Sequence, residues 1–255
     1  MTSFDPMTMT IIAAALGLGG LLKGATGAGT PIVAVPVIAA FFDVRLAVAV
    51  LCLPNLCTNL AQMRRYGGAR LEGRFTPSFV AAGALGALAG TVLLTSMPGR
   101  MLLLLVNAAI IAYIALRLLH PDFRLARRAA GRLAFPVGLI AGILQGAAGI
   151  SAPVSLSFLN AMRLRRESFI FTISTFFAAM SAVQIPALYV AGLLTPQILL
   201  LSLVALVPLF AAIPVGAWLA RSLSPDGFDK LTLLLLCGLA LRLTHDALSG
   251  PSGAD

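Results

Sequence analysis

The sequence predicts an all-α polytopic membrane protein, and three properties lead to this fold class. Of the 255 residues, 59% are hydrophobic and only 11% are charged, whereas soluble domains carry about 25% charged residues. The mean hydropathy is +0.99, and the stretches between charge clusters are long enough to cross a hydrocarbon core about 30 Å thick. Backbone groups in lipid must bond within their own segment, which favours helices. Apolar runs such as 102–106 lack the alternation of a transmembrane β-barrel.

Ten apolar segments are expected along the chain, and two of them are unusually short. The segments are 7–22, 30–42, 46–63, 77–96, 100–119, 133–144, 152–162, 168–191, 197–220 and 228–244. At a rise of about 1.5 Å per residue, 30–42 and 152–162 do not cross a bilayer alone. We expect these two to be broken or re-entrant half-helices.

The two halves of the chain align at an offset of 122 residues, which predicts two repeats of about five segments each. The block GLLKGATGAGTP at 20–31 lies over GILQGAAGISAP at 142–153, and Gln62 lies over Gln184. We expect a first repeat over 1–122, a basic cytoplasmic linker over 123–132 and a second repeat over 133–255. Chance similarity between apolar helices is the alternative explanation.

Arginines in the connecting loops predict the orientation, because cytoplasmic loops retain positive charge. They cluster in the loops around 64–74, 117–132, 163–166 and 221–230, which we place in the cytoplasm. Five segments per repeat is an odd number, so the repeats should be inverted in the membrane, as in many transporters. The basic residues flank membrane segments and form no single soluble face, so no nucleic-acid partner is expected.

Two glycine-rich breaks precede the short segments and predict an anion site near the bilayer centre. The candidate residues are Gly24, Thr26, Gly27, Gly29, Thr30 and Pro31 in the first break, and Gly146, Gly149, Ser151 and Pro153 in the second. Glycine permits unusual backbone angles, and proline suits the first turn of a helix. A helix starting in mid-membrane directs N–H groups and its positive dipole end at an anion, with Ser151 as a candidate cap. Close helix packing through small residues is the alternative.

Lys23 is the only lysine in the hydrophobic part of the chain, and its counterpart in the second repeat is the neutral Gln145. Charges inside a membrane are costly and are functional by default, so Lys23 is expected to neutralise a bound anion. A side chain that reaches the membrane interface from a shorter segment is the alternative.

Polar side chains follow one face of two equivalent segments and predict the wall of a cavity. In the first repeat Asn55, Asn59 and Gln62 recur at intervals of four and three, so they share one helix face. In the second repeat Thr175 and Gln184 are the candidates. Hydrogen bonding between helices without any substrate is the alternative.

Acidic residues fall only in loops, termini or segment ends. A cation carrier or a proton antiporter normally needs a carboxylate within the membrane, so the pattern favours an anion. The sequence also has no His-Glu metal motif and no Gly-x-Ser-x-Gly elbow, so we expect no enzyme, no metal and no cofactor.

These motifs together resemble the sulfite exporter TauE/SafE family of membrane permeases. The resemblance rests on KGATGAGTP at 23–31 followed by an apolar run, on YGGAR at 66–70, and on the repeated GAAGISAP block at 146–153. It implies export or uptake of small, often sulfur-containing anions such as sulfite, thiosulfate and organosulfonates. The family's second motif is usually richer in glycine than 146–153, which leaves the substrate open.

We therefore expect a multi-pass transporter in a bacterial cell inner membrane. Its partners would be the lipid bilayer and a small anion, sulfite or an organosulfonate, moved by alternating access between the two repeats. A non-transporting membrane subunit of a larger complex is the alternative function. A homodimer is left open.

Overall fold

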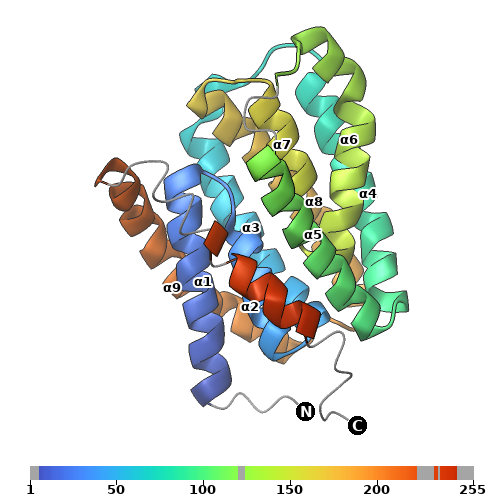
Figure 1. Ribbon diagram of the computed structural model, residues 1–255, viewed down its shortest axis with the longest axis vertical. Coiled ribbons are helices and arrows are strands. Elements are labelled where there is room, and N and C mark those ends of the chain that lie inside the picture. The colour runs from blue at the N-terminus through green and yellow to red at the C-terminus, as the bar shows by residue number, and fades with distance from the viewer. Residues whose placement is uncertain (1–5, 120–123, 223–232, 235, 246–255) are drawn as a thin grey trace.

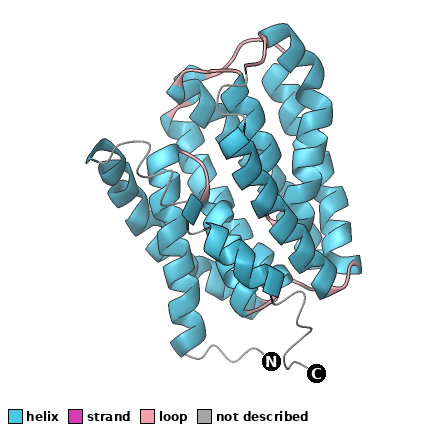
Figure 2. Cartoon of the chain, viewed as in Figure 1, coloured by secondary structure: helices cyan, strands magenta, loops and turns pink. Residues whose placement is uncertain are grey.

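The computed structural model describes residues 6–119, 124–222, 233–234 and 236–245, and every regular element in these ranges is a helix (Figures 1 and 2). Seven of the helices are long and apolar enough to cross a membrane. They are α1 (Pro6–Thr26), α3 (Val44–Arg65), α4 (Phe75–Ser96), α5 (Gly99–Leu119), α6 (Arg127–Ala148), α8 (Arg166–Val190) and α9 (Pro196–Ser222). The predicted fold class, an all-α multi-pass membrane protein, is confirmed.

Two helices are too short to span a bilayer. α2 (Thr30–Phe41) has 12 residues and α7 (Ala152–Ala161) has 10, which correspond to about 18 Å and about 15 Å. They match the two expected half-helices. A 3₁₀ turn, η1 (Gly67–Ala69), connects α3 to α4. Of the tenth expected segment, residues 233–234 and 236–244 are helical and the others lie outside the described residues.

Two segment boundaries differ from the sequence-based expectation. α1 continues to Thr26, so Lys23 lies in its last turn, and the chain first leaves the helix at Gly27, which has a φ of 82°. α6 starts at Arg127, so residues 127–132 of the expected linker form its first turns. Arginine is a good helix former, and its exposed side chains here need no apolar partner.

The two hairpins that contain the short helices enter the molecule from opposite ends. In Figure 1, α1 begins and α2 ends toward the lower edge, whereas α6 begins and α7 ends toward the upper edge. A hydrogen bond from Leu125 N to Ala161 O, at 2.8 Å, joins the chain just before α6 to the end of α7. The breaks within both hairpins therefore lie in the interior.

Glycines allow two helix pairs to pack backbone to backbone. A Cβ on Gly24 of α1 would lie 2.0 Å from the Ile213 oxygen of α9, and one on Gly146 of α6 would lie 2.3 Å from the Ala87 oxygen of α4. Gly24 and Gly146 are 122 residues apart. Each packs its own helix against a helix of the other half, so equivalent glycines make equivalent contacts across the boundary between the halves. The inversion of the repeats in the membrane stays a prediction, and these paired contacts agree with it.

A bulkier residue at this packing position should destabilise the protein. At Gly142, an added Cβ would lie 2.2 Å from the Gly83 oxygen, so Gly142→Ala must separate α4 from α6 and should cost about 1–3 kcal/mol. The control is Gly131→Ala in the same helix, where nothing lies within 4 Å; it should be neutral or stabilising by about 0.5 kcal/mol. Unfolding of the purified protein in mixed detergent micelles measures both. Equal stability of the two variants would contradict the close packing.

Candidate functional site

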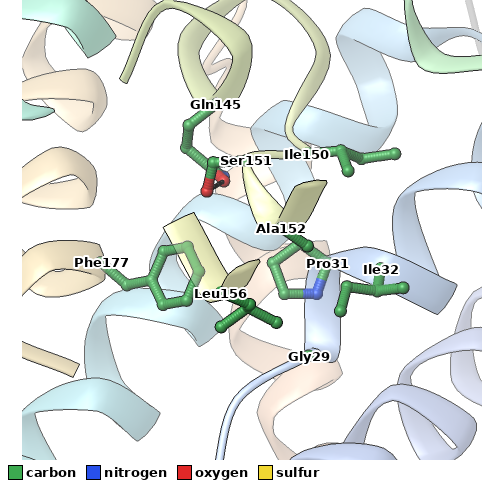
Figure 3. A pocket seen from close by; sticks show the side chains of 9 residues that line it. All are labelled: Gly29, Pro31, Ile32, Gln145, Ile150, Ser151, Ala152, Leu156 and Phe177. Atoms are coloured by element: carbon green, nitrogen blue, oxygen red, sulfur yellow. Dashed lines mark hydrogen bonds between the residues drawn. The ribbon is translucent and has the colours of Figure 1, made fainter. Parts of the chain in front are cut away.

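The breaks of the two hairpins meet in the interior and line a common pocket (Figure 3). α2 contributes Gly29, Pro31 and Ile32, which precede or form its first turn. The α6–α7 break contributes Ile150 and Ser151, and Figure 3 shows the side chains of Gln145 and Ser151 directed toward each other at its edge. Two segments 122 residues apart in sequence therefore form the two sides of one small space.

No side chain caps the helix that starts on either side of this pocket. α2 starts at Thr30 after Gly29, which has a φ of 128°, and its N-cap makes no side-chain hydrogen bond. α7 starts at Ala152, and Ser151 is at its N-cap position but does not cap it either. The expectation that the Ser151 side chain caps α7 is therefore wrong. Its Oγ instead donates to Gln145 Oε1 at 3.1 Å.

An adjoining cleft carries the polar side chains of the two long central helices. Asn55 of α3 donates its amide to Ser181 Oγ of α8 at 3.2 Å, and both line the cleft with Gln145 and Gln184. Pro31 belongs to this cleft and to the first pocket. The polar face of α3 and that of α8 therefore point at the two helix starts.

Lys23 connects to this cleft through hydrogen bonds. Its side chain is only 1% exposed, and its Nζ donates to Asn59 Oδ1 at 2.7 Å. Asn59 Nδ2 in turn donates to Asn55 Oδ1 at 2.8 Å, and Asn55 reaches Ser181. The alternative that Lys23 extends to the membrane interface does not hold, because the ammonium lies among α1 and α3 inside the bundle.

No carboxylate balances the Lys23 charge within the described part of the chain. Its acidic residues are Asp43, Glu72 and Glu167, none of which is buried, and the ion pair found there joins Arg45 to Asp43. The other six acidic residues, Asp5, Asp122, Asp226, Asp229, Asp246 and Asp255, lie outside the described residues. Burying a charge without a partner is costly, so this position favours a negatively charged guest.

Gln62 and Gln184 direct their amides at the breaks themselves. Gln62 Nε2 donates to the Gly27 oxygen at 3.0 Å, and Gln184 Nε2 donates to the Gly146 oxygen at 3.1 Å. Ser174 Oγ of α8 donates to Gln62 Oε1 at 2.9 Å. The two glutamines are equivalent in the sequence alignment, and each donates to a glycine oxygen at the break of its own half, although the two acceptors are three positions apart in the alignment.

The structure separates the other expected site residues into groups. Thr26 and Thr175 donate to backbone oxygens of their own helices, at Leu22 and Phe171. Gly24 and Gly146 pack against neighbouring helices, whereas Gly27, Gly29 and Gly149 have positive φ. Thr30 Oγ1 donates to the Gly19 oxygen at 3.3 Å. Pro153 is buried in the first turn of α7.

Sequence reasoning did not include three polar residues that the structure brings to the site. Ser181 lies 122 residues after Asn59, so the repeat alignment carried a signal for it. Cys52, which lines the cleft, stands among apolar residues in the sequence. Ser174 lies 122 residues after it and next to Thr175, so it too lies on the polar part of its segment.

A helical bundle with two opposed broken hairpins whose breaks meet in the interior is typical of a membrane transporter. A family model described as Sulfite exporter TauE/SafE matches residues 11–243, and the chain belongs to this family. It is thus a multi-pass membrane permease and not an enzyme. No curated protein and no solved structure matches the chain significantly.

Removing the acceptor of the buried ammonium should destabilise the protein. Asn59→Leu leaves Lys23 Nζ without Asn59 Oδ1, and the loss of a hydrogen bond to a charged group costs about 1.5–3 kcal/mol. Asn59→Asp keeps an oxygen there and adds a counter-charge, although it also loses the Nδ2 donor to Asn55 Oδ1, so it should lose less stability than Asn59→Leu. Detergent-micelle unfolding compares the two. Equal loss in both variants would show that the donor to Asn55, which both remove, matters more than the acceptor for Lys23.

Proposed function

We propose that this permease carries a small sulfur-containing oxyanion, such as sulfite or an organosulfonate, across the bacterial inner membrane by alternating access. The anion would bind between the starts of α2 and α7. Lys23 supplies positive charge through the Asn59–Asn55 chain of hydrogen bonds, and no metal or cofactor takes part.

The buried Lys23 ammonium is the observation that carries this proposal. It is enclosed in the bundle without a carboxylate among the described residues. It is linked through Asn59 to Asn55 of the cleft, which adjoins two helix starts that lack a side-chain cap. Helix N-termini attract anions through their N–H groups and dipole. A guest with one or two negative charges and several acceptor oxygens satisfies both features, and a cation satisfies neither.

The opposed hairpins support alternating access. α1–α2 and α6–α7 enter from opposite ends of the molecule (Figure 1) and bring their breaks to one pocket. Each half therefore supplies one wall of the site, so a tilt of one half against the other opens the pocket to one side at a time. The equivalent glycine contacts of α1 with α9 and of α6 with α4 join one half to the other, so they form the matched interfaces along which such a tilt would occur.

The arginine-rich end of the molecule supports the proposed orientation. Exposed arginines gather where α3 ends, where α6 begins and where α8 begins: Arg64, Arg65, Arg70, Arg74, Arg127, Arg128, Arg132, Arg165 and Arg166. By the positive-inside rule this end faces the cytoplasm. The family of sulfur-anion permeases and this asymmetry together favour the inner membrane.

Neutralising Lys23 should abolish most anion recognition without unfolding the protein. In Lys23→Gln, the affinity for sulfite should fall at least about ten-fold, equivalent to about 1.4 kcal/mol. The matched control is Arg132→Gln, which removes an equal charge from an exposed position of α6. Binding is read from the thermal shift that each anion produces, because a ligand of the native state raises its stability.

Flux into proteoliposomes tests the transport step with the same variants. Sulfite, thiosulfate, sulfoacetate and chloride are offered in turn, and wild-type protein should move at least one of the sulfur anions faster than chloride. Wild-type affinity and flux in Lys23→Gln would overturn the site. No flux of any anion by the wild-type protein, together with a stoichiometric partner protein, would instead favour the non-transporting subunit.

A further inference from the structure

We propose that Gln62 and Gln184 are positioning residues that cover the carbonyl oxygens of the two helix breaks, and that this cover makes the pocket selective for anions. The inference rests on the proposed anion site and adds a specific role to it. It also changes the role first expected for these two side chains, which was to form the wall of the substrate cavity.

A broken hairpin places opposite partial charges side by side. The first helix of the hairpin ends in unpaired carbonyl oxygens, and the second begins with N–H groups. Where the chain turns within a few residues, as between α1 and α2, these oxygens lie only a few residues from the N–H groups that start the second helix. An uncovered oxygen there repels an anion and attracts a cation, so selectivity requires that the oxygens be bonded.

Gln62 covers the first break. Its Nε2 donates to the Gly27 oxygen at 3.0 Å, two residues before the N-cap of α2. Its Oε1 accepts from Ser174 Oγ at 2.9 Å, so α8 of the second half holds the amide in this orientation. Both ends of the amide are therefore engaged.

Gln184 covers the second break in the same way. Its Nε2 donates to the Gly146 oxygen at 3.1 Å, in the last turn of α6. Its Oε1 lies 4.0 Å from Cys52 Sγ of α3, across the boundary between the halves. The side chain is 2% exposed and lines the cleft that contains Asn55 and Ser181.

Together the two contacts form a matched pair. Each glutamine stands on the long central helix of one half, donates to the break of that same half, and faces a side chain of the other half. A residue that bound the anion directly would need a free N–H group directed into the pocket. Here one N–H of each amide is bonded to the backbone, at Gly27 or Gly146, which ties the amide to the helix break of its own half.

The test replaces each amide by a side chain of similar size without a donor. Gln62→Leu and Gln184→Leu are compared with Gln197→Leu, in which the amide removed is exposed at the start of α9. Sulfite affinity is measured by thermal shift, and local opening is measured by amide hydrogen exchange of the full-length protein in detergent micelles without any anion.

We expect sulfite affinity to fall about ten-fold in Gln62→Leu and in Gln184→Leu and to remain unchanged in Gln197→Leu. Exchange should accelerate locally, over 24–29 in Gln62→Leu and over 146–151 in Gln184→Leu, while α9 keeps its protection and so reports a folded protein. Gln62→Glu, which sets a carboxylate against the Gly27 oxygen, should lose affinity further.

The two measurements separate this inference from the proposed function. A loss of affinity with unchanged exchange at both breaks would make the glutamines direct ligands and overturn the positioning role. Unchanged affinity and unchanged exchange would also overturn it. If the wild-type protein binds no sulfur anion, the proposed function fails, and local acceleration at the breaks would still establish that the amides hold them.

Discussion

The burial of one ammonium group, with no carboxylate against it among the residues that the structure describes, constrains much of the interior of this molecule. Lys23 is held by Asn59, which bonds to Asn55, which reaches Ser181 in the other half. Each member is an uncharged amide or hydroxyl, so the network orients the charge without neutralising it. A carboxylate at any of these positions would form a buried ion pair and leave little attraction for a guest.

Composition and segment length were enough to predict the helical membrane fold, because the bilayer admits few alternatives. The short helices α2 and α7 were also predicted correctly, since 12 and 10 residues cannot cross the core. The end of α1 was harder to predict from the sequence, because Lys23, Gly24 and Ala25 are all tolerated in a last helical turn. Only the positive φ at Gly27 marks where the helix ends, and several nearby glycines could have provided it.

The sequence predicted which residues form the candidate site better than it predicted the hydrogen bonds that they make. The repeat alignment made Gln62 and Gln184 equivalent positions, and in the structure each lies at the helix break of its own half. It could not show that their amides bond the Gly27 and Gly146 oxygens, because that choice depends on how α3 and α8 pack across the molecule. Glycines had the same ambiguity: Gly24 and Gly146 serve helix packing, whereas Gly29 and Gly149 serve the turns.

Lys23 has no charged counterpart in the other half, because the residue at the equivalent position of the sequence is the neutral Gln145. In the proposed cycle the cation therefore stays attached to the same half whichever side of the membrane is open. Binding of the anion from one side of the membrane and binding from the other side then cross unequal energy barriers, although the concentration gradients alone decide the net direction of transport. A chain with identical residues at both positions would bind the anion at similar rates from the two sides.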